Sequence, residues 1–292
     1  MKILLLGKNG QVGFELQRTL AMLAEVLAYD QDVANFLDPN SVRDLIQSIS
    51  PNVIVNAAAY TAVDKAETDK SLCHAINAAG PGLLAEEARS RNALLVHYST
   101  DYVYPGNSNT PYREEDSTGP LGEYGRSKLE GDRLIQQSGV HHLTFRTAWV
   151  YGSRGQNFLL TMLRLAKERP ELRIVSDQIG APTWSRMIAE ATALAIARAA
   201  GNPAAYSGVY HLTAAGETSW FGFTEAIFDT FAPVPRPKLT PITTDQYPTP
   251  ARRPAYSVLS NEKFARTFGL KMPDWRTQLS LVASEMGVPP KS

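Results

Sequence analysis

Ile3-Leu4-Leu5-Leu6-Gly7-Lys8-Asn9-Gly10-Gln11-Val12-Gly13 is a short apolar run followed by a glycine-rich turn. The run is typical of a buried strand, and the spacing of the apolar residues that follow the turn predicts a helix. Glycine lets the backbone bend tightly and approach a pyrophosphate, while the helix N-terminus offers free N–H groups. The spacing Gly-x-x-Gly-x-x-Gly differs from the commoner Gly-x-Gly-x-x-Gly and would also suit an ordinary strand–helix turn.

The context of the turn favours a dinucleotide ligand. Asp30 directly follows the second expected strand, 17 positions after Gly13, where a carboxylate can bind the ribose of an adenosine. A carboxylate there repels a 2′-phosphate, which favours NADH. A neighbouring group could compensate for that repulsion, so NADPH stays open.

Strands and helices alternate along the first half of the chain, and the strands are apolar throughout. We expect strands at 3–6, 25–29, 53–57, 93–99, 143–150 and 209–213, and helices at 11–24, 39–49, 64–91 with a break near Gly80-Pro81-Gly82, 124–137, 157–169 and 185–200. Alternation of this kind predicts an α/β fold whose parallel sheet is covered on both faces. The crossover rule makes this a doubly wound, Rossmann-type sheet.

After residue 150 the pattern loosens, which predicts a smaller, mixed C-terminal lobe. We assign 1–150 to an NAD(P)-binding domain, to which later segments at about 185–230 return. Residues 151–292 form mainly the substrate-binding lobe, interleaved with that domain. The proline-rich segment 233–254 lacks clear periodicity and is interpreted as an ordered loop of this lobe.

The composition excludes several classes of protein. Lys plus Arg and Asp plus Glu number 29 each, and this balance argues against a nucleic-acid partner. The single cysteine, Cys73, fits a reducing compartment. The apolar run at 3–6 is shorter than the core of a signal peptide, and no run reaches the length of a membrane span. We therefore expect a soluble, cytoplasmic protein without a membrane partner.

Tyr124 and Lys128 form a Tyr-x-x-x-Lys pattern on an expected helix. Residues four positions apart share one helix face, so the phenol and the ammonium are neighbours. The pKa of a free tyrosine is about 10, and a nearby cation lowers it. Tyr124 could then give a proton to a carbonyl that is being reduced, and Lys128 could bind a nicotinamide ribose. With 12 tyrosines in the chain, an exposed chance pair explains the pattern alone equally well.

Two strand ends add to this pattern. Ser99-Thr100-Asp101 ends the fourth strand, where doubly wound folds bind ligands, and a hydroxyl there can donate to a carbonyl oxygen. Asn56-Ala57-Ala58-Ala59 ends the third strand, and its small side chains would let a flat cofactor lie against the backbone. A local turn or cap and simple close packing are the alternative explanations.

Together these motifs resemble the extended short-chain dehydrogenase/reductases. Longer stretches at 55–67, 146–151, 177–183 and 247–254 are similar to the dTDP-4-dehydrorhamnose reductase family in particular. The resemblance implies that a hydride passes from NADPH or NADH to C4 of dTDP-4-dehydro-L-rhamnose, giving dTDP-L-rhamnose. It implies that Tyr124 donates the proton, that Lys128 tunes it and that Thr100 binds the carbonyl.

The same resemblance implies the remaining contacts. The cofactor contacts are Gly7, Gly10, Gln11, Val12, Gly13, Asp30, Phe36, Ala59, Tyr60 and Thr61, together with Tyr124 and Lys128. The substrate contacts are Tyr98, Thr100, Asp101, Trp149 and Arg253, of which Arg253 suits a nucleotide diphosphate or is a plain surface arginine.

The chain also departs from the family. Some members dimerise around Mg²⁺ held by glutamates; Glu15 fits that pattern, but Arg186 stands where another acid is expected. We therefore expect no required metal, and a monomer or weak homodimer. Asn35 replaces an acid that can precede the Phe36 position, which affects one cofactor contact.

Two other functions would use the same fold. A nucleotide-sugar epimerase or dehydratase would retain NAD and return the hydride, and a Thr-Asp-Glu triplet would favour the dehydratase, whereas Tyr102 follows Asp101 here. A regulatory subunit would bind a partner protein without turnover. The intact Thr100, Tyr124 and Lys128 favour the reductase.

Overall fold

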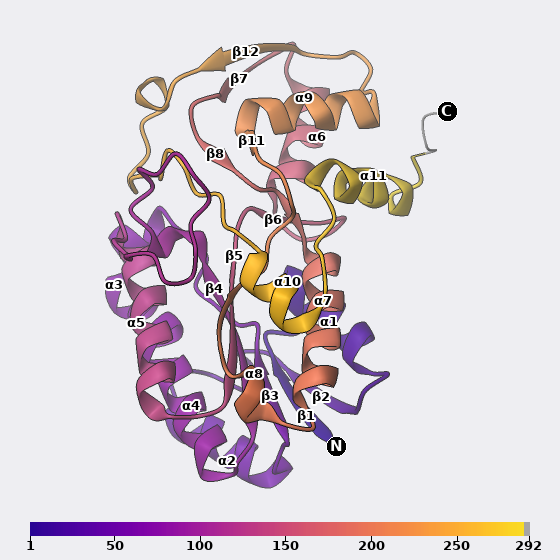
Figure 1. The fold of residues 1–292 in the computed structure, drawn as a ribbon. Helices are drawn as coiled ribbons and strands as arrows, with labels where there is room; N and C mark the ends of the chain where they lie inside the picture. The colour runs from indigo at the N-terminus through magenta and orange to yellow at the C-terminus, as the bar shows by residue number, and fades with distance from the viewer. Residues whose placement is uncertain (289–292) are drawn as a thin grey trace.

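Six parallel strands form the central sheet of the computed structural model, which describes residues 1–288 (Figure 1). In spatial order they are β10 (Gly208–His211), β5 (His142–Thr147), β4 (Leu94–Thr100), β3 (Val53–Asn56), β1 (Lys2–Leu6) and β2 (Glu25–Tyr29). Every residue of β3, β4 and β5 is buried, as expected for strands covered on both faces. Because β2 and β3 flank β1 on opposite sides, the chain reverses direction across the sheet there, which is where such folds bind ligands.

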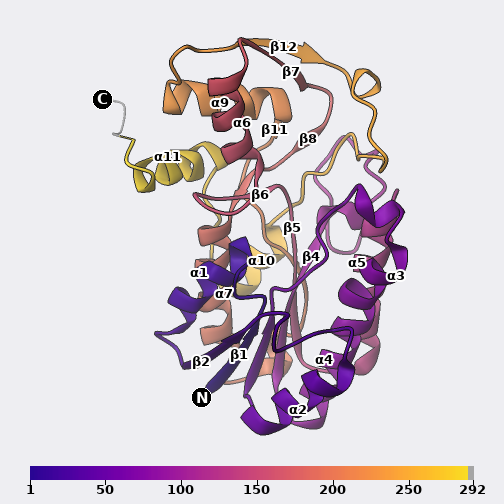
Figure 2. The ribbon, with the colours of Figure 1, turned by 180° about the vertical axis from the view of Figure 1, so that it is seen from behind.

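Helices cover both faces of this sheet (Figure 2). On one face lie α1 (Gln11–Leu20) and α7 (Ser185–Ala199), and on the other lie α2 (Pro39–Ile49), α4 (Gly80–Ser90) and α5 (Glu123–Ser138). Alternate residues of one strand therefore enter different cores: Ile3 packs with Leu16 and Ile188, whereas Leu4 packs with Val42 and Leu84. The doubly wound α/β fold expected from the sequence is confirmed.

A smaller lobe lies beyond the carboxyl edge of the sheet (Figure 1). It contains β6 (Val150–Tyr151), α6 (Phe158–Glu168), β7 (Glu171–Val175), β8 (Ile179–Gly180), β9 (Thr183–Trp184), β11 (Thr218–Ser219), α9 (Trp220–Phe231), β12 (Lys238–Ile242) and α11 (Trp275–Glu285). Its separate apolar core includes Tyr151, Phe223 and Trp275. Between its segments the chain returns to the sheet through α7, α8 (Pro203–Tyr206) and β10, and then through α10 (Glu262–Phe268). The functions assigned to 1–150 and 151–292 stay predictions, and 289–292 lie outside the described residues.

Two expected elements end three or four residues earlier than predicted. The strand at 143–150 stops at Thr147, because Trp149 adopts a φ of 47°, which a bulky residue in a strand cannot have. Val150 and Tyr151 instead pair with β9. The helix expected at 11–24 ends at Leu20 and is followed by turns.

The expected break near Gly80-Pro81-Gly82 is wrong. A 3-10 turn, η1 (Lys65–Glu67), precedes α3 (Lys70–His74), and a π-helical turn, η2 (Ala75–Ala79), leads directly into α4. Pro81 lies at the start of α4, where a backbone N–H is dispensable, so the helical path continues. The irregularity therefore lies one turn earlier than glycine and proline suggested.

The segment 233–254 is more regular than expected. It contains β12, which pairs in parallel with β7, and the 3-10 turn η4 (Thr244–Gln246). Pro241 lies within β12, and a strand in a two-stranded sheet tolerates a residue without an N–H.

None of the helices within residues 1–288 is long and apolar enough to span a membrane.

A buried ion pair fastens α5 to the sheet. Asp132 on α5 lies 3.1 Å from the Nε of Arg146 on β5, and both side chains are almost fully buried. Arg146 also donates from Nη1 to the hydroxyl of Tyr104 at 2.7 Å. A buried charge that loses its partner keeps its desolvation cost, so this pair fixes where α5 lies.

We expect Asp132→Ala to lower the free energy of unfolding by about 3–5 kcal/mol, because Arg146 would be left buried without its carboxylate. Chemical denaturation measures this loss. Glu130→Ala is the control, since its pair with Arg133 is solvent-exposed at 3.8 Å and contributes at most about 1 kcal/mol. Equal losses in the two variants would contradict the role given to the buried pair.

Candidate active site

The glycine turn lies as close to the neighbouring backbone as glycine allows. Gly7 has a φ of +83°, and a Cβ there would lie 2.6 Å from the amide nitrogen of Ala58 at the end of β3. A Cβ on Gly13 would lie 2.0 Å from the carbonyl oxygen of Gly7. No described side chain caps α1, which begins after Gly10. The first N–H groups of α1 are thus available to an anion.

Asp30 holds the glycine turn in place through its carboxylate. One carboxylate oxygen accepts from the backbone N–H of Asn9 at 3.0 Å and the other from that of Gln31 at 2.8 Å. Phe36 lies nearby, and its ring packs so closely on α4 that a Cβ on Gly80 would be 2.8 Å from it. Gly80 thus makes room for this ring.

A cavity of about 890 Å³ runs along the carboxyl edge of the sheet. It brings together most of the residues that the sequence predicted for the cofactor: Gly7, Gly10, Gln11, Val12, Asp30, Phe36, Ala59, Tyr60, Thr61, Tyr124 and Lys128. Gly13 does not line it, because that residue packs against Gly7 beneath the turn. This lining suits a dinucleotide. The uncapped N-terminus of α1 can bind the phosphates, the small residues at 57–59 leave room for a flat ring, and Asp30 lies at the adenosine end of the cavity.

Sequence reasoning missed Asn77, which holds the loop after β3 in place. Its side-chain oxygen accepts from the backbone N–H of Tyr60 at 2.9 Å, and its amide donates to the carbonyl of Tyr60 at 3.0 Å. Asn77 lies in the π-helical turn η2, a kind of irregularity that is frequent at functional sites. The only signal in the sequence was the Gly80-Pro81 pair that follows.

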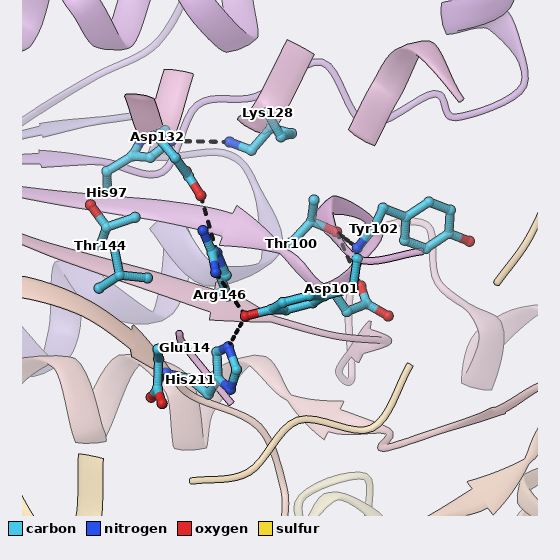
Figure 3. Close-up of polar contacts among 12 residues, drawn as sticks. His97, Thr100, Asp101, Tyr102, Glu114, Lys128, Asp132, Thr144, Arg146 and His211 are labelled. Carbon is cyan, nitrogen blue, oxygen red and sulfur yellow. Dashed lines mark hydrogen bonds and ion pairs between the residues drawn. The ribbon is translucent and has the colours of Figure 1, made fainter. Parts of the chain in front are cut away.

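Thr100, Asp101 and Tyr124 meet where β4 ends. The Thr100 hydroxyl donates to a carboxylate oxygen of Asp101 at 3.0 Å and accepts from the N–H of Tyr102 at 3.2 Å (Figure 3). The phenol of Tyr124 interacts with the side chain of Thr100. Burial raises the pKa of Asp101 to about 6. These contacts bring the three side chains together as the sequence predicted.

Lys128 is oriented differently from what the sequence suggested. Its Nζ donates to the carbonyl oxygen of Tyr98 at 2.6 Å and lies 3.2 Å from Nε2 of His97. Burial raises the pKa of Tyr124 instead of a cation lowering it, and burial lowers the pKa of Lys128 to about 8. The phenol is therefore protonated at neutral pH, which is the state that a proton donor needs.

Of the predicted substrate contacts Tyr98 and Trp149, only Tyr98 lines the cavity, and both side chains already make contacts within the protein. Tyr98 donates its hydroxyl to Thr192 of α7 at 2.8 Å, because alternate residues of β4 face opposite sides of the sheet. Its hydroxyl is thus used in the core and is not free for a sugar. The Trp149 ring stacks on Trp220 of the smaller lobe, with centroids 3.4 Å apart.

Arg253 reaches the site from the smaller lobe. Its Nη2 donates to Asp64 at 2.8 Å, while its buried Nη1 has no hydrogen-bond partner within the part of the chain that the structure describes. It also lies beside Tyr102, whose pKa burial raises to about 12 against the lowering effect of this cation. A guanidinium N–H that has no hydrogen-bond partner among the described residues and lies on an arginine beside Tyr102 suits a phosphate oxygen.

Arg186 bridges two acids near the N-terminal half of α1. Its Nε lies 3.0 Å from Glu15, and its Nη1 lies 2.6 Å from Glu285. Across residues 1–288 there is no group of three or more His, Cys, Asp or Glu side chains that could hold a metal ion. The independence from metal stays a prediction.

The family model and several similar relatives and structures point to the same family. The sequence model of the family described as RmlD substrate binding domain matches residues 1–288. The dTDP-4-dehydrorhamnose reductase of Burkholderia thailandensis is 49% identical, over 98% of this chain and 99% of the relative. The crystal structure of a dTDP-4-dehydrorhamnose reductase from Clostridium acetobutylicum superposes with a TM-score of 0.92 at 37% identity, over 98% of this chain and 100% of that one.

A second solved structure includes the cofactor. The dTDP-4-dehydrorhamnose reductase from Bacillus anthracis, in complex with NADP, superposes with a TM-score of 0.90 at 33% identity and covers 97% of this chain and 99% of its own. The similarity extends over both lobes and is not confined to the dinucleotide fold. This chain therefore belongs to the dTDP-4-dehydrorhamnose reductase family.

Proposed function

We propose that this protein transfers a hydride from NADPH or NADH to C4 of dTDP-4-dehydro-L-rhamnose and so forms dTDP-L-rhamnose. The observation that carries the proposal is that Tyr124 lines the cavity that starts at the glycine turn and interacts with Thr100 at the end of β4. Full-length similarity to reductases of this name supports the substrate. The NADP complex of the Bacillus anthracis relative supports the cofactor.

The chemistry divides between the cofactor and the side chains. When bound, the reduced nicotinamide supplies the hydride. Tyr124 gives its proton to the C4 oxygen as negative charge develops there, and its raised pKa keeps it protonated until then. Thr100 shifts its hydrogen bond from Asp101 to that oxygen, which stabilises the same charge.

Other side chains position the reactants. Lys128 lines the cavity beside Tyr124 and binds the ribose next to the nicotinamide. Asp30 binds the adenosine ribose at the other end. Arg253, with its unpartnered Nη1, binds the diphosphate of the sugar nucleotide, and Trp149 packs against the sugar.

We place this reaction in the cytoplasm, in a monomer or weak homodimer that needs no metal and binds neither nucleic acid nor membranes. Equal numbers of acidic and basic residues and one buried cysteine support this setting.

Loss of reduced-nicotinamide absorbance with dTDP-4-dehydro-L-rhamnose tests the function, in parallel reactions with NADH and NADPH. We expect Tyr124→Phe to lower kcat about 10²–10⁴-fold without weakening cofactor binding, because only the transferable proton is lost. Tyr206→Phe, at the opposite end of the sheet, is the control and keeps full activity. Folded, cofactor-binding enzyme that oxidises neither cofactor would refute the proposed reaction.

We expect Gly13→Ala to weaken cofactor binding about 5- to 150-fold, since the added Cβ would lie 2.0 Å from the Gly7 oxygen and displace the turn. Gly201→Ala is the matched control, because no heavy atom lies within 4 Å of a Cβ at that position. Titration of intrinsic fluorescence with NADPH measures both affinities. Unchanged affinity in Gly13→Ala would show that the turn does not hold the dinucleotide.

A further inference from the structure

A line of buried polar groups ends at Lys128. Asn56 at the end of β3 and His97 in β4 are register partners on adjacent parallel strands, so their side chains lie together on the face that α5 covers. The Asn56 amide nitrogen lies 3.1 Å from Nδ1 of His97. Nε2 of His97 lies 3.2 Å from Lys128 Nζ (Figure 3). Each of the three residues is only 1% exposed, so the hydrogen bonds among them decide which groups donate and which accept.

A backbone N–H fixes the orientation of Asn56. The N–H of Ala58 donates to the side-chain oxygen of Asn56 at 3.2 Å. A backbone N–H can only donate, so turning the amide over would set two donors against each other. The amide nitrogen therefore faces His97, and Nδ1 of His97 must accept its hydrogen bond.

The position of the histidine proton follows. Burial holds the pKa of His97 well below its usual range, so the imidazole is neutral and has a single N–H. Because Nδ1 accepts, that hydrogen lies on Nε2 and points at Lys128 Nζ. An ammonium has only donors to offer, whereas a neutral amine can accept through its lone pair and still donate to the carbonyl of Tyr98.

We propose that Asn56 fixes His97 in its Nε2–H tautomer and that His97 thereby favours the neutral amine of Lys128, so that this lysine exchanges its proton at near-neutral pH. His97 and Asn56 are then positioning residues that act through Lys128. The effect on rate rests on the proposed reductase function, but the protonation state does not and can be measured without substrate.

Burial and the surrounding charged side chains also affect the pKa of Lys128. Burial is the largest influence on Lys128 and lowers its pKa to about 8, while Asp132 on α5 and Cys73 on α3 raise it. Asp132 is already paired with Arg146, which limits its pull on the lysine. Donation from His97 adds to the effect of burial, since it stabilises the neutral amine alone.

The protons of the reaction balance under this arrangement. The hydride goes to C4 and the Tyr124 proton to the C4 oxygen, which leaves a phenolate. Lys128 takes one proton from solvent, stabilises the phenolate as a cation, and passes the proton to Tyr124. The amine is then neutral again, and each turnover has consumed one hydride and one solvent proton.

Nitrogen NMR of ¹⁵N-histidine-labelled enzyme without ligands tests the proposal. The protein has five histidines, and the signal that disappears in His97→Gln identifies His97. We expect an unprotonated Nδ1 and a protonated Nε2 at neutral pH. A protonated Nδ1 would overturn the proposal, whatever the enzyme's activity.

Asn56→Asp keeps nearly the same side-chain shape and is expected to reverse the tautomer of His97. A carboxylate facing Nδ1 requires the hydrogen there, so Nε2 becomes an acceptor and an ammonium fits at Lys128. We expect the His97 tautomer to switch and the pKa of Lys128, read by lysine ¹³C NMR, to rise by about one unit or more, with the inflection of kcat/KM moving up equally.

Asn92→Asp is the control for this variant. It adds the same charge at an exposed turn before β4, at the other end of the strand, and we expect no change in tautomer or lysine pKa. If Asn56→Asp also leaves the His97 tautomer unchanged, the proposal is wrong. Normal tautomer behaviour without any NADPH oxidation would instead refute the reductase function alone.

Discussion

Parallel alignment of the strands is the constraint on which the site depends. In a parallel sheet every carboxyl end lies at the same edge, so β1, β3, β4 and β5 deliver Gly7, Asn56, Thr100 and Thr147 to one line. The smaller lobe covers that edge (Figure 1). Arg253 pairs there with Asp64 of the loop after β3. Residues far apart in the sequence thus share one cavity without any local motif that joins them.

The helix α5 links this edge to the interior. It carries Tyr124 and Lys128 toward the cavity and Asp132 toward Arg146 one turn further along. A shift of the helix would expose or separate the buried pair, and would move the phenol away from Thr100. Stability and chemistry therefore use the same helix.

The sequence predicted the fold wherever periodicity and capping agreed. For α2, Asp38 as cap and Pro39 in the first turn fix the start, and the structure has the same bounds. Prediction from the sequence failed where tertiary contacts override the local backbone preference of the residues. The left-handed backbone of Trp149 ends β5 early, and pairing with β7 makes a strand of the proline-containing β12.

For the site, too, the features set by local sequence could be predicted and those set by tertiary contacts could not. The glycines and the Tyr124–Lys128 pair follow from local spacing and from resemblance, and the cavity brings them together. The partners of Lys128 could not be foreseen, because a strand register and a histidine tautomer decide them. The pairing of Arg253 with Asp64 joins positions 189 residues apart, and no local pattern records it.

The return of β10 to the sheet has a consequence for biosynthesis. This edge strand, Gly208–His211, pairs with β5 only after much of the smaller lobe has been made. During synthesis, the backbone groups on one edge of β5 therefore stay without a strand partner until residues 148–207 have been translated and β10 is available. The larger lobe cannot be completed as an N-terminal unit, and the two lobes must mature together.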